Sequence, residues 1–136
     1  MTDVMRNAEK ARFNMIQQQI RPWEVLDPSV LSLLSVVRRE EFVPAGCEAL
    51  AFSDMEIPLT GKPGQTMLMP KIEARILQEL GLRNTDTVLE IGTGSGYMAA
   101  LLAAKAEFVY TVEIDPAVAD NARNNLQHYG VANVCV

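Results

Sequence analysis

The stretch TVLEIGTGSGYMAALLAAK, residues 87–105, joins a short apolar run to a glycine-rich turn and then to a run that is apolar almost all round. The first run (87–91) has the length and side chains of a buried strand, and residues 97–105 have those of a helix. The three glycines between them permit positive φ angles and let a ligand approach the backbone closely. The segment therefore predicts a strand, a tight turn and a helix, in that order.

The same alternation continues to residue 136. FVYTVEI (108–114) is β-branched and aromatic, which predicts a second strand. Asp115-Pro116 is a helix cap followed by proline, and the helix that it opens is expected to end at Gly130. ANVCV (132–136) predicts a third strand. This order implies parallel strands with right-handed crossovers, so residues 83–136 are expected to form the first half of a Rossmann-like, doubly wound α/β sheet.

The end of the chain at Val136 falls inside the third predicted strand. In a doubly wound sheet the ligand crevice lies where the strand order reverses, which requires a neighbour on the other side of residues 87–91. No remaining segment supplies one, so we expect the chain to be an N-terminal piece of a longer protein. The alternative is a three-stranded domain whose exposed edge pairs with another chain.

Residues 1–82 are predicted to form a helical and loop-rich region. Its first helix carries one apolar face and ends at Arg21-Pro22, because a residue before proline leaves the α region. That face is expected to hold Phe13, Ile16 and Ile20. Asp27-Pro28 repeats the cap-and-proline signal and opens a helix that is expected to reach Arg39.

A long ordered loop is predicted at residues 44–66, which are rich in proline and glycine. Loops of that length in a compact domain are usually functional or disordered. The segment KIEARILQEL (71–80) follows as a third helix that ends at Gly81. Its apolar face is expected to hold Ile72, Ile76, Leu77 and Leu80.

The composition excludes several classes of protein. Twelve Lys and Arg against seventeen Asp and Glu give a net charge of −5, which argues against general binding to nucleic acid or to an anionic membrane. No uncharged stretch has the length of a membrane helix, and the N-terminus does not resemble a secretory signal. Cys47 and Cys135 are too few for a disulfide framework or a zinc site. We expect a soluble cytoplasmic protein with reduced thiols and no metal.

Two carboxylates stand near the glycine turn. Glu90 precedes the first glycine by two residues, and Glu113 follows 23 residues later at the end of the second strand. That interval is close to the ~20 residues expected of an acid that binds ribose hydroxyls. Ile114 beside it offers an apolar surface to a purine. The triplet could also be a structural turn, and Glu113 a surface acid at the end of a strand.

The choice of cofactor depends on two details. A dinucleotide fingerprint is G-x-G-x-x-G, but Tyr97 occupies the position of its last glycine. Glu90 would also repel a pyrophosphate, whereas S-adenosyl-L-methionine carries an ammonium and a sulfonium that a carboxylate attracts. The sequence therefore favours S-adenosyl-L-methionine over a nicotinamide cofactor.

These residues resemble a known family. VLEIGTGSGYMAALLA (88–103) and VYTVEID (109–115) are similar to the cofactor-binding half of class I methyltransferases, and most similar to the protein-L-isoaspartate O-methyltransferase family. The resemblance extends upstream through REEFVP, AFSDMEIPL and PGQTMLMP, and covers about residues 13–136. It implies an S-adenosyl-L-methionine-dependent O-methyltransferase that acts on isoaspartyl carboxylates in protein repair, and residues 1–136 alone are expected to be inactive.

The resemblance also implies roles for particular residues. The cofactor-binding set is Glu90, Gly92, Thr93, Gly94, Ser95, Gly96, Glu113 and Ile114. Gln65 and Thr66 belong to the loop over the reacting groups. Leu68 occupies the place where the family usually has a serine that faces the transferred methyl.

Because of this difference at Leu68, the sequence leaves two alternatives for the methyl acceptor. One is an isoaspartyl residue of a protein or peptide, and the other is a diverged acceptor such as a small molecule. An alternative is a cofactor-binding or interaction protein without catalysis. Methyl transfer to an ionised carboxylate needs positioning and exclusion of water, not a strong base. The single histidine, His128, is accordingly expected to lie at a helix end and not in the site.

Overall fold

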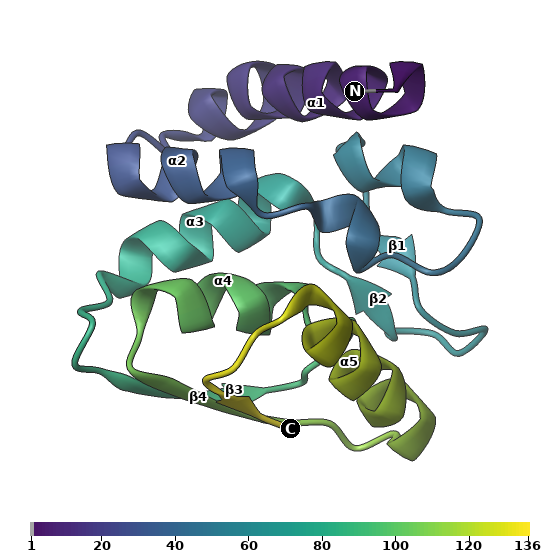
Figure 1. Cartoon of the computed structure of the whole chain (residues 1–136), viewed down its shortest axis with the longest axis vertical. Helices are drawn as coiled ribbons and strands as arrows, with labels where there is room; N and C mark the ends of the chain where they lie inside the picture. The colour runs from purple at the N-terminus through teal and green to yellow at the C-terminus, as the bar shows by residue number, and fades with distance from the viewer. Residues whose placement is uncertain (1) are drawn as a thin grey trace.

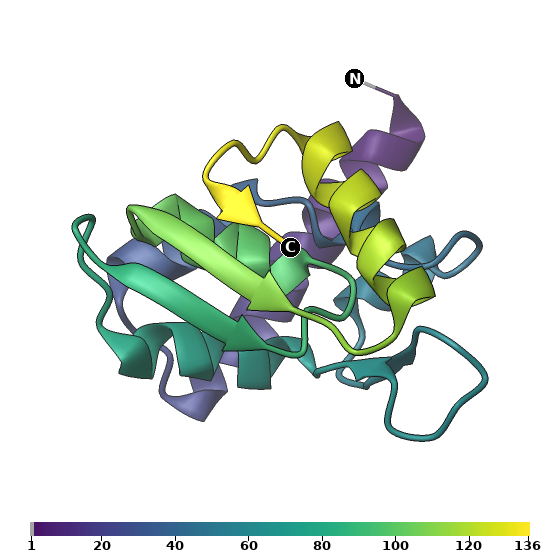
Figure 2. The same cartoon turned by 90° about the horizontal axis from the view of Figure 1, so that it is seen from below.

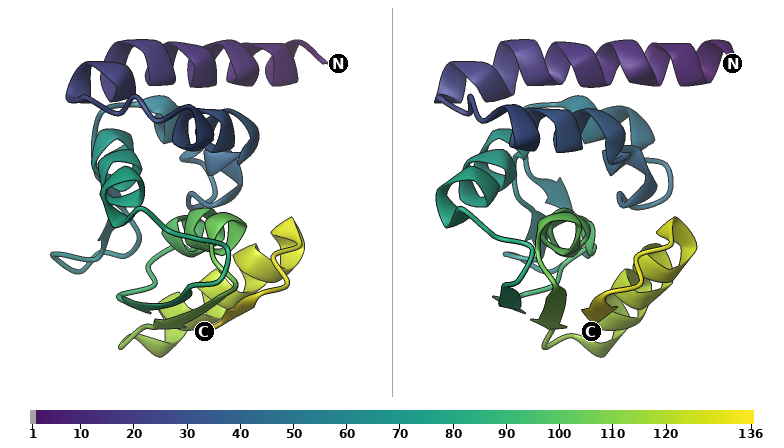
Figure 3. Two further views of the ribbon diagram at one scale, coloured as in Figure 1. Left: turned by 90° about the vertical axis from the view of Figure 1, so that its left-hand side faces the viewer. Right: turned by 60° about the vertical axis from the view of Figure 1, so that its left-hand side comes forward.

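The computed structural model describes residues 2–136. The α-helices and strands in chain order are α1 (Asp3–Met15), α2 (Pro28–Val36), β1 (Ile57–Pro58), β2 (Thr66–Met67), α3 (Pro70–Leu80), β3 (Thr87–Ile91), α4 (Tyr97–Lys105), β4 (Phe108–Val112), α5 (Pro116–Tyr129) and β5 (Val134–Cys135). Figure 1 shows them as a stack, with α1 at one end, the parallel sheet at the other, and α2, α3 and α4 between them. Figure 3 shows the same order from two other sides. None of the helices in residues 2–136 has the length and hydropathy needed to cross a membrane.

The sheet holds three parallel strands in the order β3-β4-β5, as predicted. β3 and β4 pair along five residues, from Thr87 opposite Phe108 to Ile91 opposite Val112. Two right-handed crossovers that run in one direction place α4 and α5 on the same side of such a sheet. The α/β arrangement expected for residues 83–136 is therefore present, although β4 ends at Val112, two residues before the predicted end.

One face of this sheet is open. Figure 2, seen from below, shows β3 and β4 with no helix lying across them. Leu89 and Ile91 are 64% and 76% exposed there, and their partners in register, Tyr110 and Val112, are exposed as well. The prediction of a buried strand at 87–91 was thus wrong, because the described residues supply helices for one face only. β3 has no second strand neighbour among them, and pairing of this edge with another chain stays a prediction.

The second helix begins where its cap was predicted and ends early. The Asp27 carboxylate accepts the Ser29 N–H at 2.8 Å, and Pro28 occupies the first helical position. The helix ends at Val36, three residues before the predicted end at Arg39. The chain then becomes extended at Val37 and carries Arg39 into the interior.

The first helix buries a different face from the predicted one. Ile16 and Ile20 are buried as expected, but Phe13 is exposed. The buried stripe passes through Arg12 and Met15, and a π-helical turn (Ile16–Ile20) then shifts the helical phase. A prediction based on a constant helical period misses that shift.

The buried face of α3 also differs from the predicted one. Ile76 and Leu80 were expected in the core, yet both are exposed. They face a cavity beside β3, and the side chains that pack into the core lie along the next stripe of the helix. Those buried residues are Pro70, Glu73, Ala74 and Leu77.

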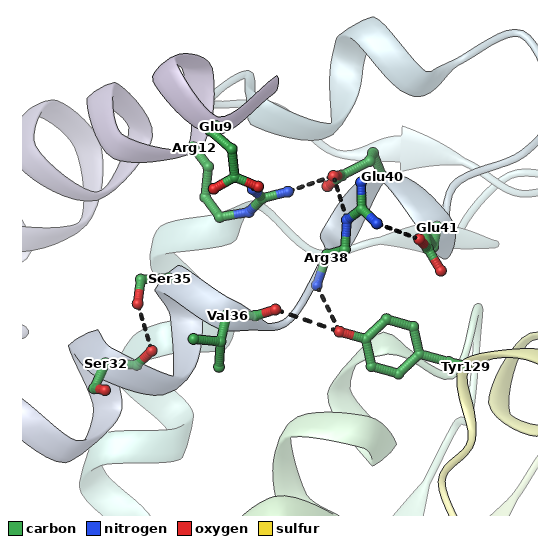
Figure 4. A network of polar contacts seen from close by, with 9 residues as sticks. All are labelled: Glu9, Arg12, Ser32, Ser35, Val36, Arg38, Glu40, Glu41 and Tyr129. Atoms are coloured by element: carbon green, nitrogen blue, oxygen red, sulfur yellow. Dashed lines mark hydrogen bonds and ion pairs between the residues drawn. The ribbon is translucent and has the colours of Figure 1, made fainter. Parts of the chain in front are cut away.

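One hydrophobic core crosses the predicted boundary at residues 82 and 83. Phe42 packs against Tyr97 with ring centroids 5.6 Å apart, and against Tyr129 at 5.2 Å. The Tyr129 hydroxyl accepts the Arg38 N–H at 3.1 Å and donates to the Val36 carbonyl at 3.4 Å (Figure 4). The two regions therefore share one interior, and their division into domains stays a prediction.

We predict that Gly96→Ala destabilises the fold by about 1–3 kcal/mol. Gly96 has φ +91°, and an added Cβ would lie 3.1 Å from the Leu126 Cγ of α5. Urea unfolding measures the change in free energy. Gly61→Ala is the matched control, because its Cβ would meet nothing within 4 Å. Equal stability of the two variants would contradict this account of the turn.

Candidate functional site

A cavity of about 320 Å³ lies at the carboxyl end of β3. Five parts of the chain form its walls: β2 with the residue after it, one side of α3, β3, the glycine turn, and α4. Most of the lining is apolar, and two carboxylates, Glu73 and Glu90, interrupt it. The lining residues are Thr66, Met67, Leu68, Glu73, Ile76, Leu80, Val88, Leu89, Glu90, Ile91, Gly92, Thr93, Gly94, Ser95, Met98 and Leu102.

The glycine turn is hydrogen-bonded to the end of β4, beside the last pair of the β3–β4 ladder. The N–H groups of Gly92 and Thr93 both donate to the Val112 carbonyl, at 2.8 and 3.1 Å. Gly92 and Gly94 have φ +95° and +57°, a conformation that strains any residue with a Cβ. The Thr93 hydroxyl lies 2.6 Å from that of Thr111 on β4, so the turn is fixed to its neighbour strand by backbone and side chain together.

Glu90 lies where this turn meets the cavity. The Thr111 hydroxyl donates to its carboxylate at 2.7 Å. Burial raises the pKa of Glu90 from the usual 4.5 to about 7, and the nearby charge of Glu113 adds to that increase, while the bond from Thr111 opposes it. Near neutral pH this carboxyl therefore exchanges between its charged and neutral forms, and a cation beside it would favour the charged form.

Glu113 connects the turn to the start of α5. Its carboxylate accepts the Gly94 N–H at 3.1 Å through one oxygen and the Asp115 N–H at 3.1 Å through the other. It does not line the cavity. Ile114 is 95% exposed beside it, so an acidic and an apolar side chain stand together just outside the cavity.

The loop predicted to lie over the reacting groups, here called the acceptor loop (residues 65–68), divides into two parts. Gln65 does not line the cavity, because its amide donates to Asp115 at 3.2 Å and its carbonyl oxygen accepts a hydrogen bond from Thr60. Lys62 also reaches Asp115, at 3.1 Å, and these two contacts lower the pKa of Asp115 to about 2. Thr66 and Leu68 do line the cavity, and Leu68 is 40% exposed there.

Three functional candidates were missed from the sequence. Glu73 is buried on α3, lines the cavity, and has its pKa raised to about 7 by burial, although its partner Arg39 opposes the increase. Its position three residues after Pro70 and four before Leu77 was a usable signal for the buried face. No local pattern identifies Arg39 as its partner. The sequence pattern predicts only a strand position for Thr111.

The arrangement has a definite electrostatic character. Glu90, whose partner is only a hydroxyl, favours a ligand that carries positive charge, whereas Glu73 is already paired with Arg39. The N-terminus of α4 beside the turn favours negative charge, so a ligand with both kinds of group is suited to the site. Within residues 2–136, no cluster of three or more His, Cys, Asp or Glu side chains could hold a metal ion.

Comparison with known proteins gives one consistent family. The model of the protein-L-isoaspartate(D-aspartate) O-methyltransferase family matches residues 10–136. Protein-L-isoaspartate O-methyltransferase 2 of Pelobacter propionicus is 42% identical over 130 residues, which are 96% of this chain and 57% of that protein. The protein-L-isoaspartate O-methyltransferase of a Picosynechococcus species is 44% identical over 123 residues, or 90% and 54%. The chain thus spans just over half the length of these curated relatives.

Solved structures agree with the fold. A protein-L-isoaspartate O-methyltransferase superposes with a TM-score of 0.73 at 25% identity, over 93% of this chain and 40% of that one. A putative protein-L-isoaspartate O-methyltransferase from Plasmodium falciparum, solved with S-adenosyl-L-homocysteine, gives a TM-score of 0.69 at 16% identity, over 93% and 60%. The predicted Rossmann-like α/β fold and the predicted resemblance are confirmed.

We predict that Glu90→Gln stabilises the chain at high pH and not at low pH. The folded pKa of about 7 lies above the ordinary 4.5, so the wild type loses stability as the pH rises between these values. The variant lacks that loss, and the difference should grow from near zero below pH 4.5 to about 3 kcal/mol above pH 7. Chemical unfolding at several pH values measures it. The exposed Glu107→Gln is the control, and an equally flat curve for both would disprove the burial effect.

Proposed function

Because the chain belongs to the protein-L-isoaspartate(D-aspartate) O-methyltransferase family, we propose that it serves S-adenosyl-L-methionine-dependent methyl transfer to a protein carboxylate, that of an isoaspartyl residue. One observation carries the proposal. Glu90, the glycine turn and the Thr66–Leu68 segment line one cavity, which supports a cofactor bound at the turn with the acceptor beside Thr66–Leu68.

The residues present fit this cofactor. Glu90 would pair with its ammonium, since the carboxylate has only the Thr111 hydroxyl as a hydrogen-bond partner in the described residues. Glu113 would accept hydrogen bonds from the ribose hydroxyls, because each of its oxygens accepts one N–H and keeps a further lone pair. The exposed Ile114 would pack against the purine. When bound, the cofactor supplies an electrophilic methyl group on a sulfonium.

The acceptor needs little chemistry from the protein. An isoaspartyl carboxylate is already ionised at neutral pH, so no general base has to activate it. The chain contributes position and exclusion of water, and the apolar side chains of Met67, Leu68 and Ile76 are suited to the second task. The absence of a histidine from the cavity lining is consistent with this reaction.

Leu68 favours a second candidate for the acceptor. Its side chain stands in the cavity and cannot donate a hydrogen bond to a carboxylate. A diverged acceptor that carries an apolar group next to its nucleophile would fit this wall better, and such an acceptor could be a small molecule.

A cytoplasmic location is also part of the proposal, and the unpaired thiols Cys47 and Cys135 support it.

We predict that the chain binds S-adenosyl-L-homocysteine about tenfold more tightly at pH 8 than at pH 6. With a pKa of about 7, Glu90 is about one-tenth ionised at pH 6 and about nine-tenths at pH 8. Calorimetric titration measures the dissociation constants. Glu90→Gln should weaken binding at pH 8 and remove the pH dependence, whereas Glu107→Gln should do neither. Wild-type affinity in Glu90→Gln would exclude Glu90 from the cofactor site.

We also predict that the chain, when extended to the full length of its relatives, methylates an isoaspartyl peptide and not the same peptide with an ordinary aspartate, whereas the 136 residues alone do not. Transfer of a labelled methyl group measures the turnover. Leu68→Ser should raise the rate roughly tenfold, because a hydroxyl can donate to the charged acceptor. If the extended chain binds S-adenosyl-L-homocysteine but neither it nor its Leu68→Ser variant methylates the peptide, the diverged acceptor or a role in binding alone replaces the isoaspartyl proposal.

A further inference from the structure

The guanidinium of Arg39 joins three segments that are far apart in the sequence. Its side chain is fully buried, and Nη1 donates to the Ala51 carbonyl at 2.7 Å. Nη2 donates to the Leu68 carbonyl at 2.8 Å, and Nε donates to the Glu73 carboxylate at 3.1 Å. The same group lies 5.5 Å from the ring centroid of Tyr97 on α4. Arg39 therefore contacts the segment at Ala51, the residue that follows β2, α3 and α4.

The contact with Leu68 fixes a part of the cavity wall. Leu68 lies between β2 and α3, and its side chain faces the cavity while its carbonyl points to Arg39. A guanidinium holds its donors in one rigid plane, so the three acceptors are fixed relative to one another. The position of the Leu68 backbone is thereby tied to α3 and to the core.

Glu73 is the counter-charge that this arrangement needs. It is the one carboxylate in contact with Arg39 among the described residues, at 3.0 Å from Nη2. A buried ion pair is weak evidence for stability, because the loss of hydration offsets most of the attraction. A buried arginine that bonds two carbonyls from different segments is better explained by the geometry that it imposes.

We propose that Arg39 is a positioning residue for the acceptor side of the cavity. It holds the Leu68 carbonyl and so sets where the Thr66–Leu68 segment stands relative to the glycine turn, with Glu73 as its required counter-charge. The effect on acceptor binding rests on the proposed methyl transfer, whereas the effect on the loop does not. The two parts can therefore fail separately.

The first test measures local opening of the loop. In Arg39→Lys, one ammonium replaces the planar fork and cannot hold both carbonyls and Glu73. Hydrogen–deuterium exchange of residues 66–69 should accelerate roughly tenfold to hundredfold, while exchange in β4 stays within about twofold of the wild type. Equal acceleration in both segments, or none in residues 66–69, would overturn the proposal.

Arg12→Lys is the matched control. Arg12 is also buried, lies 5.4 Å from the ring centroid of Phe52, and pairs with Glu9 and Glu40 (Figure 4). It makes no hydrogen bond to residues 65–69 in the described structure. We expect this variant to leave exchange in residues 66–69 at the wild-type rate. If exchange in residues 66–69 accelerates as much in Arg12→Lys as in Arg39→Lys, the effect is common to buried arginines and the proposal for Arg39 is wrong.

A double variant covers the case in which Arg39→Lys does not fold. Arg39→Met with Glu73→Met removes both charges and keeps the buried volume, a change that proteins often tolerate. Because the Leu68 carbonyl still loses its donor, residues 66–69 should exchange fast in a folded protein. Wild-type protection of this segment in the double variant would overturn the proposal.

The functional test separates cofactor from acceptor. In the chain extended to the length of its relatives, Arg39→Lys should raise the KM for the isoaspartyl peptide and lower kcat, and should leave the dissociation constant of S-adenosyl-L-homocysteine within about twofold. A parallel loss of both affinities would show a general structural role and contradict the proposal. If the extended wild type neither binds S-adenosyl-L-homocysteine nor turns over, the proposed function fails, and the exchange measurements still decide the role of Arg39.

Discussion

The hydrogen bonds from the glycine turn to the Val112 carbonyl are the constraint on which the site depends. The bond from Gly92 belongs to the β3–β4 ladder and holds the end of β3 in register, and the positive φ angles of Gly92 and Gly94 then turn the chain toward α4. The bend also places Glu90 next to Thr111 and Gly94 next to Glu113, so two acids 23 residues apart flank one turn. Residues with a Cβ could follow this path only with strain, which explains why glycine stands at the bend.

A second constraint is the number of buried charges around one small cavity. Glu73 and Glu90 both lose hydration there, and burial raises the pKa of each to about 7. The two carboxylates differ in their partners, because Glu73 is paired with a buried guanidinium and Glu90 has only a hydroxyl partner. Glu73 is thus held in place for structure, and Glu90 stays free to respond to a ligand. The same chemical group serves two purposes because its neighbours differ.

Local sequence signals were sufficient to predict most of the helices and strands. The features that they did not predict depend on long-range contacts. The cap at Asp27, the glycine turn and the helix opened by Asp115-Pro116 depend on neighbouring residues, so the sequence was sufficient to find them. The prediction that Phe13, Ile76 and Leu80 are buried was wrong, because hydrophobic periodicity reveals neither a π-helical turn nor a cavity. The local pattern predicts only a helix end at Arg39, because the partners of its side chain lie 12 to 34 residues away. The cofactor-binding roles of the turn and of Glu113 stay predictions.

The open face of the sheet has a thermodynamic consequence for the folded chain. Its accessible surface is 7608 Å², against about 7000 Å² for an average monomer of its mass. Leu89, Ile91 and Ile114 are already mostly exposed in the folded chain, so unfolding exposes little more of them and adds little to the heat-capacity change. The heat-capacity change on unfolding should therefore fall below the usual ~12–15 cal/mol/K per residue. A smaller value flattens the dependence of stability on temperature, which makes this chain less prone to denaturation by cold than its size alone would suggest.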